Sequence, residues 1–217
     1  MAPQTGMWGM QGTWSCRARI AEPMAIFALI MAYIWKLRYT WHGCWVLILG
    51  LVLLSHALRK ESAGELGFAR RNLEGCLREC ATLLLLLTLA MLAAGMVFST
   101  TRPIAFDEGL TALLGYLPWG LLQQYLLNGY FVRRFETAWP RHAPLAAAAL
   151  FGAAHLPNWF LAPVAFLAGY CCGCVYLRHR NLYFLGLAHG TIGFLLFLVV
   201  PDSISHHLAI GPGWLRR

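Results

Sequence analysis

Leu117–Phe135 reads LPWGLLQQYLLNGYFVRRF, and the rest of the chain is organised around this stretch. It is apolar enough to lie in a lipid bilayer, yet it contains Gln123, Gln124 and Asn128. On a helix, where successive residues turn by about 100°, Gln124 and Asn128 share a face and Gln123 lies beside them. A primary amide in hydrocarbon is costly unless it is hydrogen-bonded, so these amides need partners on other helices or in a wet cavity.

The composition is that of a membrane protein. Of the 217 residues, 59% are hydrophobic and only 12% are charged, whereas a typical soluble domain has about 25% charged residues. The net charge of +8 does not indicate nucleic-acid binding, because the basic residues cluster in short gaps between apolar segments and form no stripe interleaved with aromatic residues. The seven cysteines, an odd number, do not indicate a secreted disulfide framework.

Seven apolar segments predict an all-α, polytopic membrane protein, a bundle of about seven transmembrane helices. A spanning helix needs about 20 residues, with a range of about 17–25. The first segment is slightly short, and the fifth contains Pro157, which makes it end early or makes it re-entrant. The expected segments are 21–35, 41–58, 80–98, 112–131, 144–160, 161–177 and 182–200.

The distribution of lysine and arginine predicts that the N-terminus is cytoplasmic. Basic residues gather between the second and third, the fourth and fifth, and the sixth and seventh segments. Together with Arg17 and Arg19 they place 12 of the 17 on one side, and the side richer in basic residues faces the cytoplasm. We therefore expect a cytoplasmic tail over residues 1–20, a transmembrane domain over 21–200 and a polar, solvated tail over 201–217.

The longest connection between apolar segments, residues 59–79, mixes four glutamates with arginines. The pattern favours an amphipathic helix that lies along the membrane surface with Leu66, Phe68 and Leu73 facing lipid. A solvated linker is the alternative.

Two apolar segments each carry one histidine. His155 precedes Pro157, which is expected to end the helix near that histidine and leave the imidazole beside irregular backbone. Irregular backbone at membrane depth occurs only where it is buried in protein or lines a water-filled cavity. His189 lies among glycines that allow a neighbouring helix to approach closely. Ionisable residues inside a membrane indicate a functional site, although a hydrogen-bonded structural role is the alternative for each histidine.

Two short motifs resemble those of the CPBP family, the intramembrane proteases related to the CAAX-processing enzyme Rce1 and to bacteriocin self-immunity proteins. Phe151-Gly-Ala-Ala-His155 is similar to the second motif of that family, and His189-Gly-Thr-Ile-Gly193 to the third. Order and spacing agree over residues 117–195, and the resemblance implies a CPBP-like core at about 80–200.

The first motif departs from the family pattern. The family has a Glu-Glu pair and, after three further residues, an arginine, whereas this chain has Gln123, Gln124 and Asn128 at the matching positions. The third motif ends in Gly193, where the family usually has Asn or Asp. In the family the first-motif glutamate is thought to act as general base on a water, and the histidines help to hold that water and the oxyanion.

The resemblance implies an intramembrane endopeptidase of a bacterial inner membrane that cleaves a membrane-bound or lipid-proximal peptide. Because glutamine is not a useful base, three interpretations stay open. In the first, His155 or His189 is the base, and Gln123, Gln124 and Asn128 orient the water and donate to the oxyanion. In the second, the two histidines and an amide oxygen bind a divalent metal such as zinc, although this is a poor zinc set. In the third, catalysis is lost and the fold serves as a membrane scaffold or immunity protein. An unrelated transporter or lipid-binding bundle is a fourth alternative, but the chain lacks the internal repeat of many transporters.

Overall fold

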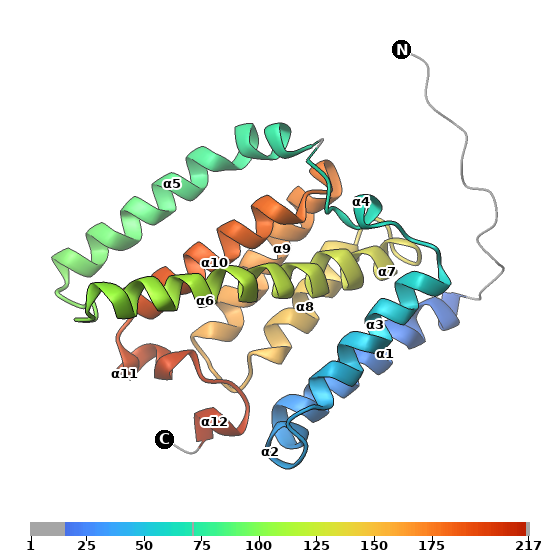
Figure 1. Cartoon of the computed structure of the whole chain (residues 1–217), viewed down its shortest axis with the longest axis horizontal. Helices are drawn as coiled ribbons and strands as arrows, with labels where there is room; N and C mark the ends of the chain where they lie inside the picture. The colour runs from blue at the N-terminus through green and yellow to red at the C-terminus, as the bar shows by residue number, and fades with distance from the viewer. Residues whose placement is uncertain (1–15, 71, 216–217) are drawn as a thin grey trace.

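The structure is a computed structural model that describes residues 16–70 and 72–215. Within these residues every regular element is a helix, which confirms the all-α fold (Figure 1).

Among the residues that the structure describes, seven long helical stretches follow the seven predicted segments. The first stretch is α1 (Cys16–Ala32), which continues through the π-helix η1 (Tyr33–Leu37) into α2 (Arg38–Thr40). The fourth is α6 (Phe106–Gln124), which continues through the π-helix η2 (Tyr125–Val132) into α7 (Arg133–Glu136). The other five are single helices: α3 (Cys44–Leu58), α5 (Leu73–Val97), α8 (Ala143–Ala154), α9 (Leu161–His179) and α10 (Leu182–Val199). The short elements are α4 (Ala63–Leu66), α11 (Asp202–Ser205), the 3-10 turn η3 (His206–Leu208) and α12 (Pro212–Leu215).

Within the described part of the chain, four helical spans are long and apolar enough to cross a membrane: Ile20–Thr40, Leu73–Val97, Leu161–His179 and Leu182–Val199. The protein is therefore an integral membrane protein. The first span is longer than expected because η1 and α2 extend it. The second helix, α3, is shorter, with 15 residues, because the chain turns between Trp41 and Cys44. The fifth, α8, has only 12 residues and ends before Pro157, as the sequence indicates.

The second part of the stretch Leu117–Phe135, from Gln124 onward, lies at the centre of the bundle. Seven of the eight residues of η2 are buried, and η2 contacts α8, α9 and α10. The α1–α3 hairpin lies on one side of the crossed α6 and α10, and α5 lies on the other (Figure 1). Only 6% of the apolar window of α5 is buried inside the protein, so this helix presents most of its surface to lipid.

Glycine allows α6 and α10 to cross at very short range. A Cβ atom on Gly120 would lie 2.5 Å from the Gly190 nitrogen, and a Cβ on Gly190 would lie 2.7 Å from the Tyr116 carbonyl oxygen, distances that real Cβ atoms essentially never show. Small residues let helix backbones approach in this way. Gln124 follows Gly120 by one turn and His189 precedes Gly190, so the crossing brings the amide and the imidazole together.

The connection 59–79 is not a surface helix, and the prediction that its apolar side chains face lipid is wrong for Leu66 and Phe68. Leu66 is buried, and the Phe68 ring lies 5.8 Å from the Tyr125 ring. The Tyr176 hydroxyl donates to the Leu66 carbonyl oxygen at 3.0 Å. Because α9 and η2 supply both apolar contacts and hydrogen-bond partners, this segment folds back onto the bundle instead of entering the lipid.

A buried ion cluster fixes the same connection to α7. The Glu61 carboxylate lies 2.7 Å from the Arg133 guanidinium, 2.7 Å from the Arg134 guanidinium and 2.6 Å from His56 Nδ1. Burial alone would raise the pKa of Glu61, but the hydrogen bonds from His56 and Arg134 and the Arg134 charge outweigh it and hold that pKa well below its usual range. The arginines expected to set membrane topology therefore also join two parts of the fold.

The residues from Pro201 to Leu215 do not form a solvated tail; they dock on the turn between α8 and α9. The fully buried Asn158 amide donates to the Ser205 and Ala209 carbonyl oxygens at 2.9 and 3.0 Å. The Gly211 nitrogen donates to the Leu156 carbonyl oxygen at 2.9 Å. The short, irregular turn after His155 provides these polar groups, which the hydropathy pattern did not reveal.

Candidate functional site

A chain of side-chain hydrogen bonds links the central helix to α10. Asn128 Nδ2 donates to Gln124 Oε1 at 2.5 Å, and Gln124 Nε2 donates to His189 Nδ1 at 2.9 Å. Gln124 is 1% exposed and Asn128 is 0% exposed. The amides thus find the partners that the sequence requires, and one of those partners is a predicted histidine.

The backbone that carries Asn128 is a π-helix. It begins at Tyr125, directly after Gln124, and continues to Val132. Such wide helical turns are rare and occur frequently at functional sites. A pattern read with the ordinary 3.6-residue period does not predict this turn.

The amide chain determines the tautomer of His189. An amide nitrogen only donates, so His189 Nδ1 must accept and the neutral ring carries its proton on Nε2. Asn128 Oδ1 is buried and has no hydrogen-bond partner among the described residues. Exchanging the oxygen and nitrogen positions of both side-chain amides, Gln124 and Asn128, would instead leave the Asn128 NH₂ group without an acceptor. Buried donors without a partner are rarer than buried carbonyl oxygens without one. The observed orientation is therefore the favourable one.

The backbone determines the opposite tautomer for His155. This residue caps the C-terminus of α8 and is 8% exposed. Its Nδ1 lies 2.6 Å from the Phe151 carbonyl oxygen. A carbonyl only accepts, so Nδ1 carries the proton and Nε2 keeps a free lone pair. The sequence reasoning missed the role of Phe151, although its position four residues before His155 places its carbonyl within reach.

The two histidines lie around one aromatic ring. The centroid of the Phe151 ring is 4.7 Å from that of His155 and 5.8 Å from that of His189, both in edge-to-face geometry. Gln123 lies beside Gln124 on α6 and is partly buried. Within residues 16–70 and 72–215 its amide is not part of the hydrogen-bonded chain.

The side chains at this site fit a metal ion poorly. Among the described residues no group of three His, Cys, Asp or Glu side chains is arranged to hold one. His155 and His189 each have Nδ1 occupied by a hydrogen bond, which leaves two Nε2 atoms and an amide oxygen, and zinc sites usually have more nitrogen, thiolate or carboxylate ligands than this. No chemical step is therefore assigned to a metal.

Fold and site define an all-helical integral membrane protein with paired histidines and amides at its centre. Residues 105–195 match the model of a protein family described as type II CAAX prenyl endopeptidase Rce1-like. Over this part the chain is similar to that family, which is a family of proteases, and the predicted resemblance to CPBP proteins is confirmed. The matched residues begin at the start of α6 and end within α10, so they contain all five predicted site residues. Neither curated proteins nor solved structures gave a match.

Proposed function

We propose that the protein is an intramembrane endopeptidase that cleaves a membrane-bound or lipid-proximal peptide, with His155 as general base. The observation that carries this proposal is that the two histidines beside Phe151 make different contacts at Nδ1, His155 with a backbone carbonyl oxygen and His189 with the Gln124 amide nitrogen. These contacts imply a lone pair on His155 Nε2 and an Nε2–H group on His189. One ring is therefore suited to accept a proton and the other to donate a hydrogen bond, in a segment that matches the model of a protease family.

The hydrolysis needs only these groups and water. His155 Nε2 removes a proton from a water molecule while the water oxygen attacks the carbonyl carbon of the scissile peptide. The oxyanion that develops accepts a hydrogen bond from His189 Nε2–H and a second from the Gln123 amide. The His155 imidazolium then gives its proton to the peptide nitrogen as the C–N bond breaks, which releases the two products and restores the neutral base.

Gln124 and Asn128 act as positioning residues in this proposal. The Gln124 amide keeps the His189 proton on Nε2, and the Asn128 amide fixes the orientation of Gln124. Partners of this kind set the tautomer and the direction of an imidazole, as the residues around metal-bound histidines do.

We further propose that the protein lies in a bacterial inner membrane with its N-terminus in the cytoplasm. The excess of lysine and arginine on one side supports this orientation. The connections that carry these residues, before α5, α8 and α10, follow helices that run in the same direction in the seven-helix order.

A specific observation favours a second candidate, a membrane scaffold or immunity protein without catalysis. In the motif assignment made from the sequence, Gln123 and Gln124 stand where the family has glutamates, and Gly193 stands at the last position of the third motif. Gln124 and Asn128 are also almost fully buried and bonded to each other. Amides that serve only to hold helices together would look the same.

A comparison of protein N-termini separates the two candidates. Cells that express the natural protein are compared with cells that express the His155→Ala, His189→Ala double variant at the same membrane abundance. A peptidase predicts new N-termini near membrane segments that disappear in the variant. Identical N-termini in conditions where the protein affects growth would reject the peptidase and support the scaffold.

A further inference from the structure

A groove between α1 and α3 lies outside the histidine site. Its volume is about 350 Å³. Its walls are apolar along most of their length and polar at one end, and the residues that line it are Ile26, Leu51, Leu54 and Leu58 in the apolar part and Glu22, Ser55 and Arg59 in the polar part.

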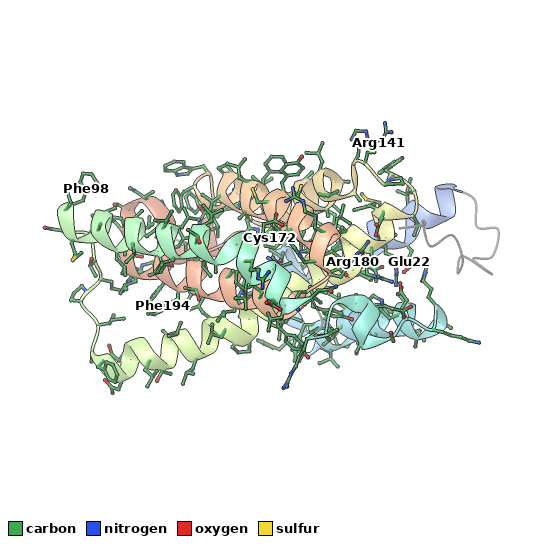
Figure 2. All side chains as sticks on the ribbon, turned by 90° about the horizontal axis from the view of Figure 1, so that it is seen from above. Glu22, Phe98, Arg141, Cys172, Arg180 and Phe194 are labelled. Carbon is green, nitrogen blue, oxygen red and sulfur yellow. The ribbon has the colours of Figure 1, made fainter. Side chains whose placement is uncertain are left out.

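The polar end is a partly exposed ion pair. The Arg59 guanidinium contacts both carboxylate oxygens of Glu22 and donates to Ser55 Oγ at 2.9 Å. The Arg59 side chain is 37% exposed and that of Glu22 is 29% exposed. Figure 2 shows Glu22 near the same end of the molecule as Arg180 and far from Phe98. Arg59 is therefore fixed in direction by its partners while its surface stays open to a ligand.

The charges around this end do not balance. Glu22 and Glu61 face Arg59, Arg133 and Arg134 within one connected cluster, because Arg134 contacts both glutamates. Glu65 interacts electrostatically with Arg133 and Glu61, so three glutamates balance the three arginines. Lys60, which follows Arg59 and is exposed, supplies the one positive charge in excess. Basic pockets between transmembrane helices bind anionic lipid head groups, and a guanidinium matches the geometry of a phosphate.

We infer that the α1–α3 groove binds an anionic phospholipid, with its phosphate at Arg59 and Lys60 and one acyl chain along Ile26, Leu51 and Leu54. From Arg59 to Leu51 the groove follows eight residues of α3, about 12 Å at 1.5 Å per residue. This length of apolar wall lies beside a cationic end, which is the shape and charge pattern of a lipid with a negatively charged head group. The site is independent of the proposed peptidase activity.

The test uses the full chain purified in detergent and native mass spectrometry. Phosphatidylglycerol and phosphatidylcholine of the same acyl composition are titrated separately. Leu54→Trp fills the groove, and Leu53→Trp is the matched control. The two leucines are adjacent on α3 and equally exposed, at 52% and 53%, but only Leu54 lines the groove.

We expect phosphatidylglycerol to bind the natural protein and Leu53→Trp at least tenfold more tightly than phosphatidylcholine does. Leu54→Trp and the exposed-charge variant Lys60→Glu should each weaken the binding of phosphatidylglycerol about tenfold or more. Lys60→Glu keeps the test decisive if Leu54→Trp does not fold. Equal binding of the two lipids by the natural protein, or equal binding of phosphatidylglycerol by every folded variant, would overturn the inference.

Discussion

The close crossing of α6 and α10 makes Gly190→Ala a sharp test of how the site is built. The added Cβ would lie 2.7 Å from the Tyr116 carbonyl oxygen and 2.9 Å from Leu117 Cα, both of them backbone atoms that no rotamer change can move. Ordinary contact begins at 3.4 Å, so the helices must separate locally by about 0.5–0.7 Å. Overpacking of this kind costs about 1–3 kcal/mol.

The same separation acts on the neighbouring hydrogen bond. The distance from Gln124 Nε2 to His189 Nδ1 is 2.9 Å, and an increase of this size takes it to the limit of a hydrogen bond. Gly190→Ala should therefore lower both the stability of the fold and the rate of any peptide cleavage. Unfolding in mixed micelles of a mild detergent and SDS measures the first effect, and the N-terminus comparison measures the second.

Gly115→Ala is the matched control for this prediction. Gly115 lies on α6, the other helix of the crossing, but a Cβ there meets nothing within 4 Å. Because alanine is favoured over glycine within a helix by about 1 kcal/mol, the control should be as stable as the natural protein or more stable. If Gly190→Ala is also as stable as the natural protein, the helices do not cross as closely as the reasoning requires.

Three further perturbations have defined outcomes. Gln123→Glu should fold but lower activity, because a carboxylate cannot donate to the oxyanion as the Gln123 amide does; a variant that fails to fold while Gln123→Ala folds well would show that the amide is structural. Glu61→Gln should cost about 3 kcal/mol of stability at pH 7, since it leaves buried arginines without their carboxylate. The pKa of Glu61 is lower in the folded than in the unfolded protein, so its contribution to stability is present above pH 4.5 and is lost as the pH falls below that value. The free energies of unfolding of the natural protein and the variant should therefore converge in acid. A difference that stays constant with pH would contradict the role of Glu61. Asn158→Ala should increase hydrogen exchange and proteolysis in the segment after Val200. The control His207→Ala changes an exposed residue of the same segment and should have no such effect. Equal protection of the segment in the two variants would show that Asn158 does not hold it.

Most of the fold could be predicted because hydropathy dominates it. Each of the seven apolar segments corresponds to a helical stretch within residues 16–70 and 72–215, and Pro157 correctly indicated the early end of α8. The prediction failed where polar contacts within the bundle compete with lipid. Leu66 and Phe68 pack inward because Tyr176 and Tyr125 supply partners that belong to distant parts of the chain. Nothing within residues 59–79 reveals those partners.

The sequence identified the residues of the hydrogen-bonded chain, Asn128, Gln124 and His189, but not their arrangement. A buried amide requires a partner, and this requirement identified Gln124 and Asn128 and proposed the histidines as partners. The pairing of Gln124 with His189, and the use of a backbone carbonyl by His155, depend on the glycine crossing and on the end of α8. Short motifs do not contain that geometry.

The proposed function depends most directly on the two tautomers. Solid-state NMR of protein labelled with ¹⁵N-histidine in lipid bilayers identifies which ring nitrogen of each histidine carries the proton, with His155→Ala and His189→Ala used to assign the two signals. We expect the proton on Nδ1 of His155 and on Nε2 of His189 in the neutral rings. The same tautomer in both histidines would contradict the division into a base and a hydrogen-bond donor.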